Sequence, residues 1–390
     1  MIVINPEKIT PCAGRSPAKN KTKFYYFYPM RTLLFIITCC VLVSCSGKKT
    51  KPSTPEIKIA DLINNSYYYI HLKGTLGDQP VTMDLIKSGP WVYKGFYTYD
   101  KVGEPITVWG SVEDDKITLN EFTSQTEDRF FKGSLDSTGT FKGIWRGKGT
   151  SYPFTLKAGF KDAIALNVYY AADSLQLLPG NPNSPLGEAS NSILWPTAQT
   201  NEETAEFIRQ SITGGKSVRN VQQYIRRDID SFLATYKVTA NDIDSSDGIS
   251  PAYSWSADGD MKVVWNQYPL LCLEYFAYEF TGGAHGNFGA NYQVLDLEKK
   301  KVLKPEDIFK PEYKTAMVPL LEKAFRKTFK VDPEKSIESM LLEKEIKPND
   351  NFYITDKGVA FSYTPYEIAP YAAGQITLFI PFADIKPLMK

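Results

Sequence analysis

The stretch Leu270–Phe309 reads LLCLEYFAYEFTGGAHGNFGANYQVLDLEKKKVLKPEDIF. Two long apolar and aromatic runs, Leu270–Phe280 and Phe288–Leu297, flank the short segment TGGAHG. Such runs around a glycine-rich turn predict a β-hairpin. The glycines expected to supply the positive φ angles of this turn are Gly282, Gly283 and Gly286.

The hairpin belongs to a region in which strands and helices come in blocks. Residues 217–236 carry an apolar stripe at helical spacing, whereas residues 164–170 and 261–266 alternate as strands do. Because no regular βαβ alternation is present, residues 161–390 predict an α+β domain with an antiparallel sheet and packed helices.

The preceding region, residues 61–160, has a different pattern. Strand candidates recur about every ten residues from Tyr67 to Lys157, with turn residues between them. Eight such strands predict an all-β antiparallel meander or a small closed barrel. A barrel of this size either holds one small apolar ligand or is filled by its own side chains, and the many aromatic residues favour a filled interior.

The amino terminus has the features of an export signal. Residues 30–44 combine a basic start with an apolar run too short to span a bilayer, which predicts a signal peptide. The following Cys45 completes a segment, LVSC, that resembles a bacterial lipobox, so lipidation of Cys45 is expected. Residues 45–60 are then expected to form a flexible linker. Residues 1–29 are interpreted as a mis-annotated or disordered extension.

This signal predicts an outer-membrane lipoprotein, held by its lipid at the periplasmic face, with the cell surface as the other possibility. The chain has 45 basic and 44 acidic residues, a balance that argues against a nucleic-acid partner. Four of its five cysteines precede residue 46, so no disulfide framework is expected in the folded part. We expect no cofactor.

Candidate binding residues lie in three places. The proline-rich segment Leu178–Gln199 is interpreted as a long loop in which Trp195 either contacts a ligand or plugs the core. His285 lies in the glycine turn, where it has a structural role, touches a ligand or acts as a general base. The third place is the segment that contains Tyr366, Glu367 and Tyr371. An acidic segment, Asp242–Gly248, has imperfect spacing for a calcium loop and is read as a solvated turn.

Three blocks carry a resemblance to a known family: YEFTGGAHG at 278–286, LKPEDIF at 303–309, and YTPYEIAPYAAG at 363–374 with the following IPF at 380–382. They resemble the domain shared by the anti-sigma factor RsiV and the peptidoglycan deacetylase PdaC. The resemblance implies an extracellular module that binds lysozyme in the former and accompanies a catalytic domain in the latter.

The chain departs from the deacetylase pattern, because that family holds a metal with two His and an Asp. This sequence has only His71 and His285, in different predicted domains, so no metal site and no catalytic residue are assigned. The sequence therefore predicts a non-enzymatic lipoprotein that binds a lysozyme-like protein or a peptidoglycan-type glycan. The alternative is an envelope glycan hydrolase or deacetylase-like enzyme that uses His285.

Overall fold

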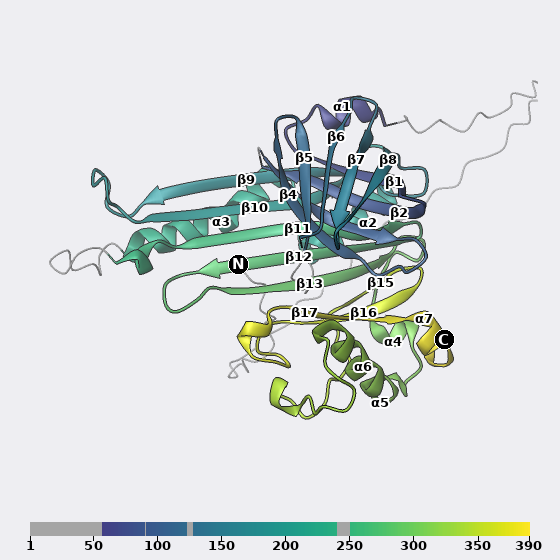
Figure 1. Ribbon diagram of the computed structural model, residues 1–390. Coiled ribbons are helices and arrows are strands. Elements are labelled where there is room, and N and C mark those ends of the chain that lie inside the picture. The colour runs from purple at the N-terminus through teal and green to yellow at the C-terminus, as the bar shows by residue number, and fades with distance from the viewer. Residues whose placement is uncertain (1–56, 90, 123–127, 240–249) are drawn as a thin grey trace, which may run out of the picture. The chain divides into compact units, whose positions relative to one another are not determined.

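The structure is a computed structural model that describes residues 57–89, 91–122, 128–239 and 250–390 (Figure 1). The predicted signal peptide, Cys45 and the segment Asp242–Gly248 lie outside these residues. Within the described ranges, no helix is both long and apolar enough to cross a bilayer.

The first described part of the chain folds into a closed antiparallel barrel of eight strands, as the strand spacing predicted (Figure 1). The barrel closes because β1 pairs with both β2 and β8. A short helix, α1 (Ile59–Ile63), precedes it. The strands are β1 (Tyr68–Leu76), β2 (Gln79–Ser88), β3 (Val92–Tyr99), β4 (Ile106–Glu113), β5 (Lys116–Phe122), β6 (Phe130–Leu135), β7 (Thr140–Gly147) and β8 (Thr150–Ala158).

The barrel interior is packed with aromatic rings. Phe131 makes edge contacts with Tyr97 and Phe154, at centroid distances of 5.0 and 5.2 Å. The Phe154 ring lies across β6 at Gly133, where a Cβ atom would come within 2.7 Å of it. A glycine between aromatic residues therefore lets a ring cross the backbone, and edge-to-face pairs of this kind add stability beyond the burial of their area.

After the barrel the chain forms a six-stranded sheet in the order β14-β13-β12-β11-β10-β9 within the described residues. Its neighbouring strands are antiparallel except β10 and β11, which run parallel. The strands are β9 (Leu166–Gln176), β10 (Leu186–Pro196), β11 (Ser256–Gln267), β12 (Leu270–Phe280), β13 (Asn287–Asp296) and β14 (Lys301–Leu303). The predicted hairpin is thus confirmed as β12–β13.

The two faces of this sheet are covered differently. On one face, α2 (Glu202–Thr213) and α3 (Val221–Val238) pack against residues such as Val263 and Leu273. On the other, Val264 and Cys272 join the core of a second sheet, ordered β15-β16-β17. In Figure 1, α3 runs along β9 and β10. The remaining elements are α4 (Pro305–Ile308), α5 (Tyr313–Ala316), α6 (Val318–Phe329), β15 (Phe352–Ile354), β16 (Gly358–Tyr363), β17 (Ile376–Pro381) and α7 (Phe382–Ile385). This is the predicted α+β class.

A chain of buried polar groups joins the barrel to the six-stranded sheet. On the barrel, the Asp84 carboxylate accepts hydrogen bonds from the Tyr69 hydroxyl at 2.6 Å and from His71 Nδ1 at 2.8 Å. The amide of Asn266 on β11 donates to the Tyr69 hydroxyl at 2.8 Å. The same amide bonds both the N–H and the C=O of Ile164. Asn266 therefore fixes the segment that connects the two parts.

Candidate functional site

The turn between β12 and β13 is built on glycine. Gly282 and Gly283 have φ angles of +95° and +96°, in the region that side chains disfavour. Gly286 does not have a positive φ, so that part of the prediction was wrong. Glycine is required at position 286 for lack of space instead, because a Cβ atom there would lie 2.5 Å from the Tyr278 ring.

His285 projects from this turn and stacks on Tyr371, from the segment before β17. The two ring centroids are 3.8 Å apart and the planes differ by 23°. The carbonyl oxygen of Gly286 accepts from the Tyr371 hydroxyl at 2.6 Å and lies 3.1 Å from His285 Nδ1. A neutral imidazole that donates from Nδ1 leaves Nε2 as an acceptor.

Tyr366 completes the group from a third position. Its hydroxyl lies 3.4 Å from His285 Nε2, and its side chain is 56% exposed. Tyr366 also has a φ of +69°, which is unusual for a bulky residue and costs about 1–3 kcal/mol. We call His285, Phe288, Tyr366 and Tyr371 the aromatic tip, since Phe288 makes an edge contact with Tyr371 at 5.6 Å.

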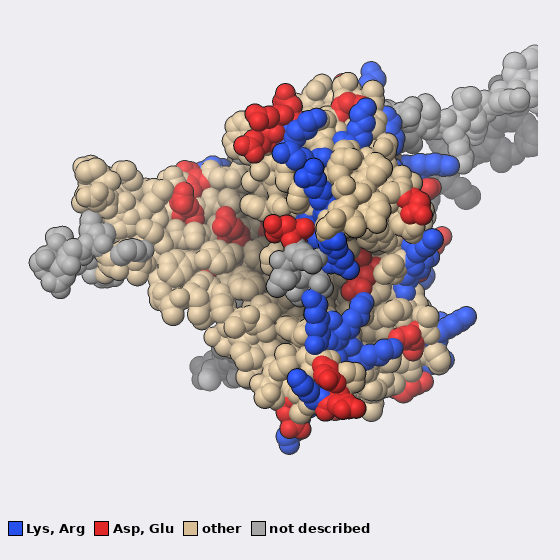
Figure 2. All heavy atoms as spheres, viewed as in Figure 1, with Lys and Arg blue, Asp and Glu red and all other residues tan. Residues whose placement is uncertain are grey.

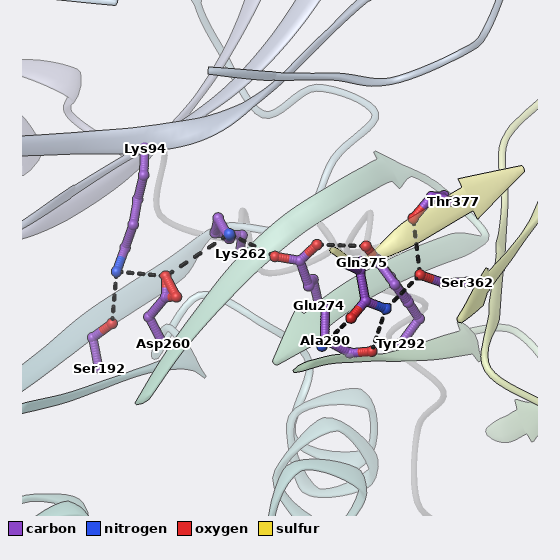
Figure 3. A network of polar contacts seen from close by, with 10 residues as sticks. All are labelled: Lys94, Ser192, Asp260, Lys262, Glu274, Ala290, Tyr292, Ser362, Gln375 and Thr377. Atoms are coloured by element: carbon purple, nitrogen blue, oxygen red, sulfur yellow. Dashed lines mark hydrogen bonds and ion pairs between the residues drawn. The ribbon is translucent and has the colours of Figure 1, made fainter. Parts of the chain in front are cut away.

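Gln375, which follows the segment with Tyr366 and Tyr371, joins that part of the chain to Ala290 of β13 (Figure 3). The side-chain oxygen of Gln375 accepts from the N–H of Ala290 at 3.1 Å, and its nitrogen donates to Ser362 at 2.8 Å. Glu367 holds the turn itself, because it accepts from the Thr364 N–H at 2.9 Å and from Asn349 at 2.8 Å. The rings of the aromatic tip are therefore positioned before any ligand arrives.

The structure brings three of the five predicted binding residues together: His285, Tyr366 and Tyr371. Glu367 lies next to Tyr366 but is occupied by its own turn. Trp195 is elsewhere, on β10, where it is 8% exposed and part of the core beneath α2 and α3. The prediction of a long loop at Leu178–Gln199 was wrong, because half of that segment, Leu186–Pro196, forms β10 in a hairpin with β9. Of the two predicted roles of Trp195, the structure therefore supports the one in which it fills the core.

The predicted alternative, an enzyme that uses His285, depends on which groups surround this side chain. Within the described part of the chain, its side-chain partners are Gly286, Tyr366 and Tyr371, and none of them is a carboxylate. In the same residues, no three His, Cys, Asp or Glu side chains are grouped closely enough to hold a metal ion. His71 lies in the barrel, beside Asp84.

A buried network of charges lies between the barrel and the sheet (Figure 3). Lys94 of β3 reaches across to Asp260 of β11, with Nζ 2.7 Å from the carboxylate and 3.4 Å from the Ser192 hydroxyl. The Asp260 carboxylate also lies 4.0 Å from Lys262, and both side chains are about one-eighth exposed. Asp260 therefore lies within ion-pair distance of two cations, whereas Lys94 lies within that distance of one carboxylate.

Lys262 is the centre of this network. Its Nζ is 2.6 Å from Glu274, which also accepts from the Tyr292 hydroxyl at 2.6 Å. The same ammonium lies 5.7 Å from the ring of Phe96, on the barrel, and 5.5 Å from that of Phe276, on the sheet. Both distances suit cation–π attraction in a desolvated place.

The pKa values of Asp260, Lys262 and Lys94 depend on the balance between burial and the neighbouring charges. Burial alone would raise the pKa of Asp260, but the charges of Lys262 and Lys94 outweigh it and hold the pKa below its ordinary value. Burial would lower the pKa of Lys262, yet Glu274 and Asp260 hold it above its ordinary value. For Lys94 burial prevails, and the pKa falls because Asp260 offsets only part of that effect.

The sequence analysis missed this network, although a signal was present. Lys262 and Glu274 are single charges inside long apolar runs, DMKVVW and LCLEYF. Charged residues are almost never buried unless they are paired, so a lone charge of each sign on neighbouring predicted strands could have indicated an ion pair.

The α+β part of the chain, with its hairpin turn and aromatic tip, has relatives. Residues 189–288 match the family described as "Deacetylase PdaC", and residues 306–383 match "Protein of unknown function (DUF3298)". A solved DUF3298 family member from Bacteroides fragilis is 24% identical, with a TM-score of 0.51, and the match covers 59% of this chain and 96% of that one.

A second solved structure, a DUF3298 family protein from Pseudomonas aeruginosa PAO1, is 22% identical, with a TM-score of 0.39, over 58% of this chain and 94% of the other. No curated protein is similar enough to count as a match. The Bacteroides fragilis neighbour supports the fold class of this region, an α+β domain. Behind the antiparallel barrel, the chain resembles the PdaC and DUF3298 families over these residues, and the predicted resemblance is confirmed.

Proposed function

We propose that this chain is a lipid-anchored lipoprotein of the cell envelope whose PdaC-like DUF3298 domain binds a peptidoglycan-type glycan at the aromatic tip, without catalysing its breakdown. The observation that carries the proposal is the tip itself. Two segments far apart in sequence place aromatic rings together at the surface, and Tyr366 is held there in a strained conformation. Strain of this kind is retained mainly where a function requires it.

The size and polarity of the aromatic tip favour a glycan over a protein. A stable protein interface requires about 800 Å² from each partner, with a hydrophobic centre and a polar rim. A few rings with hydroxyl and imidazole groups at their edges are sufficient for a sugar, which offers an apolar face and hydroxyl groups. In the view of Figure 2, the end of the sheet that carries the β12–β13 turn shows mostly uncharged side chains, which suits a neutral ligand.

The variant Tyr366→Gly tests this proposal without damage to the fold. Glycine accepts the positive φ of this position, so we expect stability to be unchanged or higher by up to about 1 kcal/mol. Loss of the exposed ring should weaken sedimentation with insoluble peptidoglycan about tenfold or more. Thermal unfolding and a peptidoglycan co-sedimentation assay measure the two effects.

The matched control is Trp109→Ala, which removes another exposed aromatic side chain, on the outer face of β4. It should leave co-sedimentation unchanged. Equal binding by wild type and Tyr366→Gly would contradict the proposal. Capture of lysozyme at low salt, with no retention on peptidoglycan, would show instead that the ligand is a protein.

The lipid anchor has its own test. Because two acyl chains on Cys45 would make membrane attachment stable, Cys45→Ala should move most of the protein from the membrane fraction to the soluble fraction. Fractionation followed by immunoblotting measures this shift. A variant that stays with the membrane would argue against lipidation at Cys45.

A further inference from the structure

The end of the barrel away from α1 carries a ring of inward-facing side chains that the proposed function does not use. Helix α1 lies at the other end, where Ile59 packs over Gly139. Directly paired residues on neighbouring strands point to the same side of the barrel wall, and Val81, Val108 and Trp145 are buried in the interior. Their partners are Tyr99, Glu121 and Tyr152, in that order, and these side chains therefore also face inward. These side chains form a layer above the aromatic core. The layer, which we call the barrel mouth, consists of Tyr99, Ile106, Glu121, Arg129, Trp145 and Tyr152.

Glu121 is held rigidly at the centre of the barrel mouth. One oxygen of its carboxylate accepts from both the Tyr97 hydroxyl and Trp145 Nε1, each at 2.6 Å. Burial and this carboxylate raise the pKa of the Tyr97 hydroxyl, which keeps its proton and remains a donor. No described residue donates to the other oxygen of Glu121, which leaves one acceptor for a ligand.

Arg129 supplies the complementary donor. Arg129 lies directly before β6 and opposite Glu121 of β5, and the backbone N–H of Glu121 donates to the Arg129 carbonyl at 2.8 Å. Its Nε is buried and has no hydrogen-bond partner among the described residues. Gly147 makes room for it, because a Cβ atom there would lie 2.8 Å from Arg129 Cγ and 2.7 Å from the Trp145 ring. An unsatisfied buried donor is costly, so Arg129 Nε, which lacks a partner within residues 57–122 (except 90), 128–239 and 250–390, is open to an acceptor on a ligand.

Aromatic rings form the wall beside these two charges. Trp145 stacks on Tyr152 with centroids 6.1 Å apart and planes 29° apart, and Tyr152 remains 48% exposed. The layer is therefore reached from solvent at Tyr152 and becomes apolar towards Phe131 and Phe154 below.

We propose that the barrel mouth is a second binding site, which takes a neutral sugar residue. An anionic ligand would be repelled by Glu121 and a cationic one by Arg129. A sugar hydroxyl both donates and accepts, so it can bond the free carboxylate oxygen and the Arg129 donor together. Its apolar face can lie on Trp145 and Tyr152, as expected for a site at the mouth of a β-barrel.

The experiment uses the full chain with Tyr366→Gly, so that the aromatic tip no longer contributes. Cellobiose and N,N′-diacetylchitobiose are the probes, and tryptophan fluorescence and saturation-transfer NMR report binding. We expect at least one disaccharide to bind, and Glu121→Gln and Arg129→Met each to weaken its binding about tenfold or more. Glu121→Gln keeps an oxygen that can accept from Tyr97 and Trp145, so the core below should stay intact.

Lys132→Met is the matched control, because Lys132 is exposed and lies opposite Thr118 and Ile144 on the outer face of the same barrel. It should leave sugar binding unchanged. The proposal would be overturned if neither disaccharide binds, or if both variants bind sugar as well as the parent protein does. It would also be overturned if an amino acid such as L-leucine, in place of the sugars, changes the fluorescence. Since the site lies in the barrel, these outcomes are independent of the glycan proposal for the tip.

Discussion

Replacement of Lys262 by methionine is expected to lower the free energy of unfolding by about 3–5 kcal/mol. The change leaves the Glu274 carboxylate, 6% exposed, with the Tyr292 hydroxyl as its remaining partner among the described residues. It also removes the cation from between Phe96 of the barrel and Phe276 of the sheet. Urea unfolding followed by tryptophan fluorescence measures the loss.

Two further variants show whether charge pairing is the cause. Lys94→Met should cost less than Lys262→Met, because burial already holds the pKa of Lys94 below its ordinary value while that of Lys262 is raised. The double variant with Lys262→Met and Glu274→Met should recover much of the loss, since no buried charge is then left unpaired. A loss below about 1 kcal/mol for Lys262→Met would contradict this account of the network.

Asn266→Ala should destabilise the protein by about 2–3 kcal/mol. The side-chain amide of Asn266 bonds the backbone N–H of Ile164 at 2.9 Å and its C=O at 2.8 Å, and alanine leaves both without these partners. It also separates the Tyr69 hydroxyl of the barrel from β11. Thermal unfolding measures the effect, and hydrogen exchange at Ile164 should become faster.

The matched control for Asn266→Ala is Thr197→Val. The Thr197 hydroxyl is buried and has no hydrogen-bond partner among the described residues. Its replacement by a methyl group of similar size should be neutral or stabilising, because nothing is left unsatisfied. Equal losses in the two variants would show that the Asn266 hydrogen bonds contribute little.

Much of the fold could be predicted because its signals are local. Alternating residues and turn residues about every ten positions indicated the strands of the barrel, and TGGAHG between two apolar runs indicated the β12–β13 hairpin. The segment before Trp195 was misread because its prolines suggested a loop. In the structure Pro185 and Pro196 lie at the edges of β10, where a strand tolerates proline.

The candidate sites were predictable only in part. His285, Tyr366 and Tyr371 could be named from their motifs, but their stacking depends on how the segment before β17 meets the turn after β12. The parallel pairing of β10 with β11 also had no local signal, since the residues that decide it are separated by α2 and α3.

By itself, the sequence determined the two-part plan, the class of each part and the family resemblance, because periodicity and turn chemistry act over a few residues. The tertiary structure decided which side chains meet. Lys94 pairs with Asp260 across more than 160 positions, and Glu121 of β5 meets Tyr97 of β3 and Trp145 of β7 only because these non-adjacent strands face one barrel interior. Such contacts depend on register and closure, which are set by the packing of the whole domain.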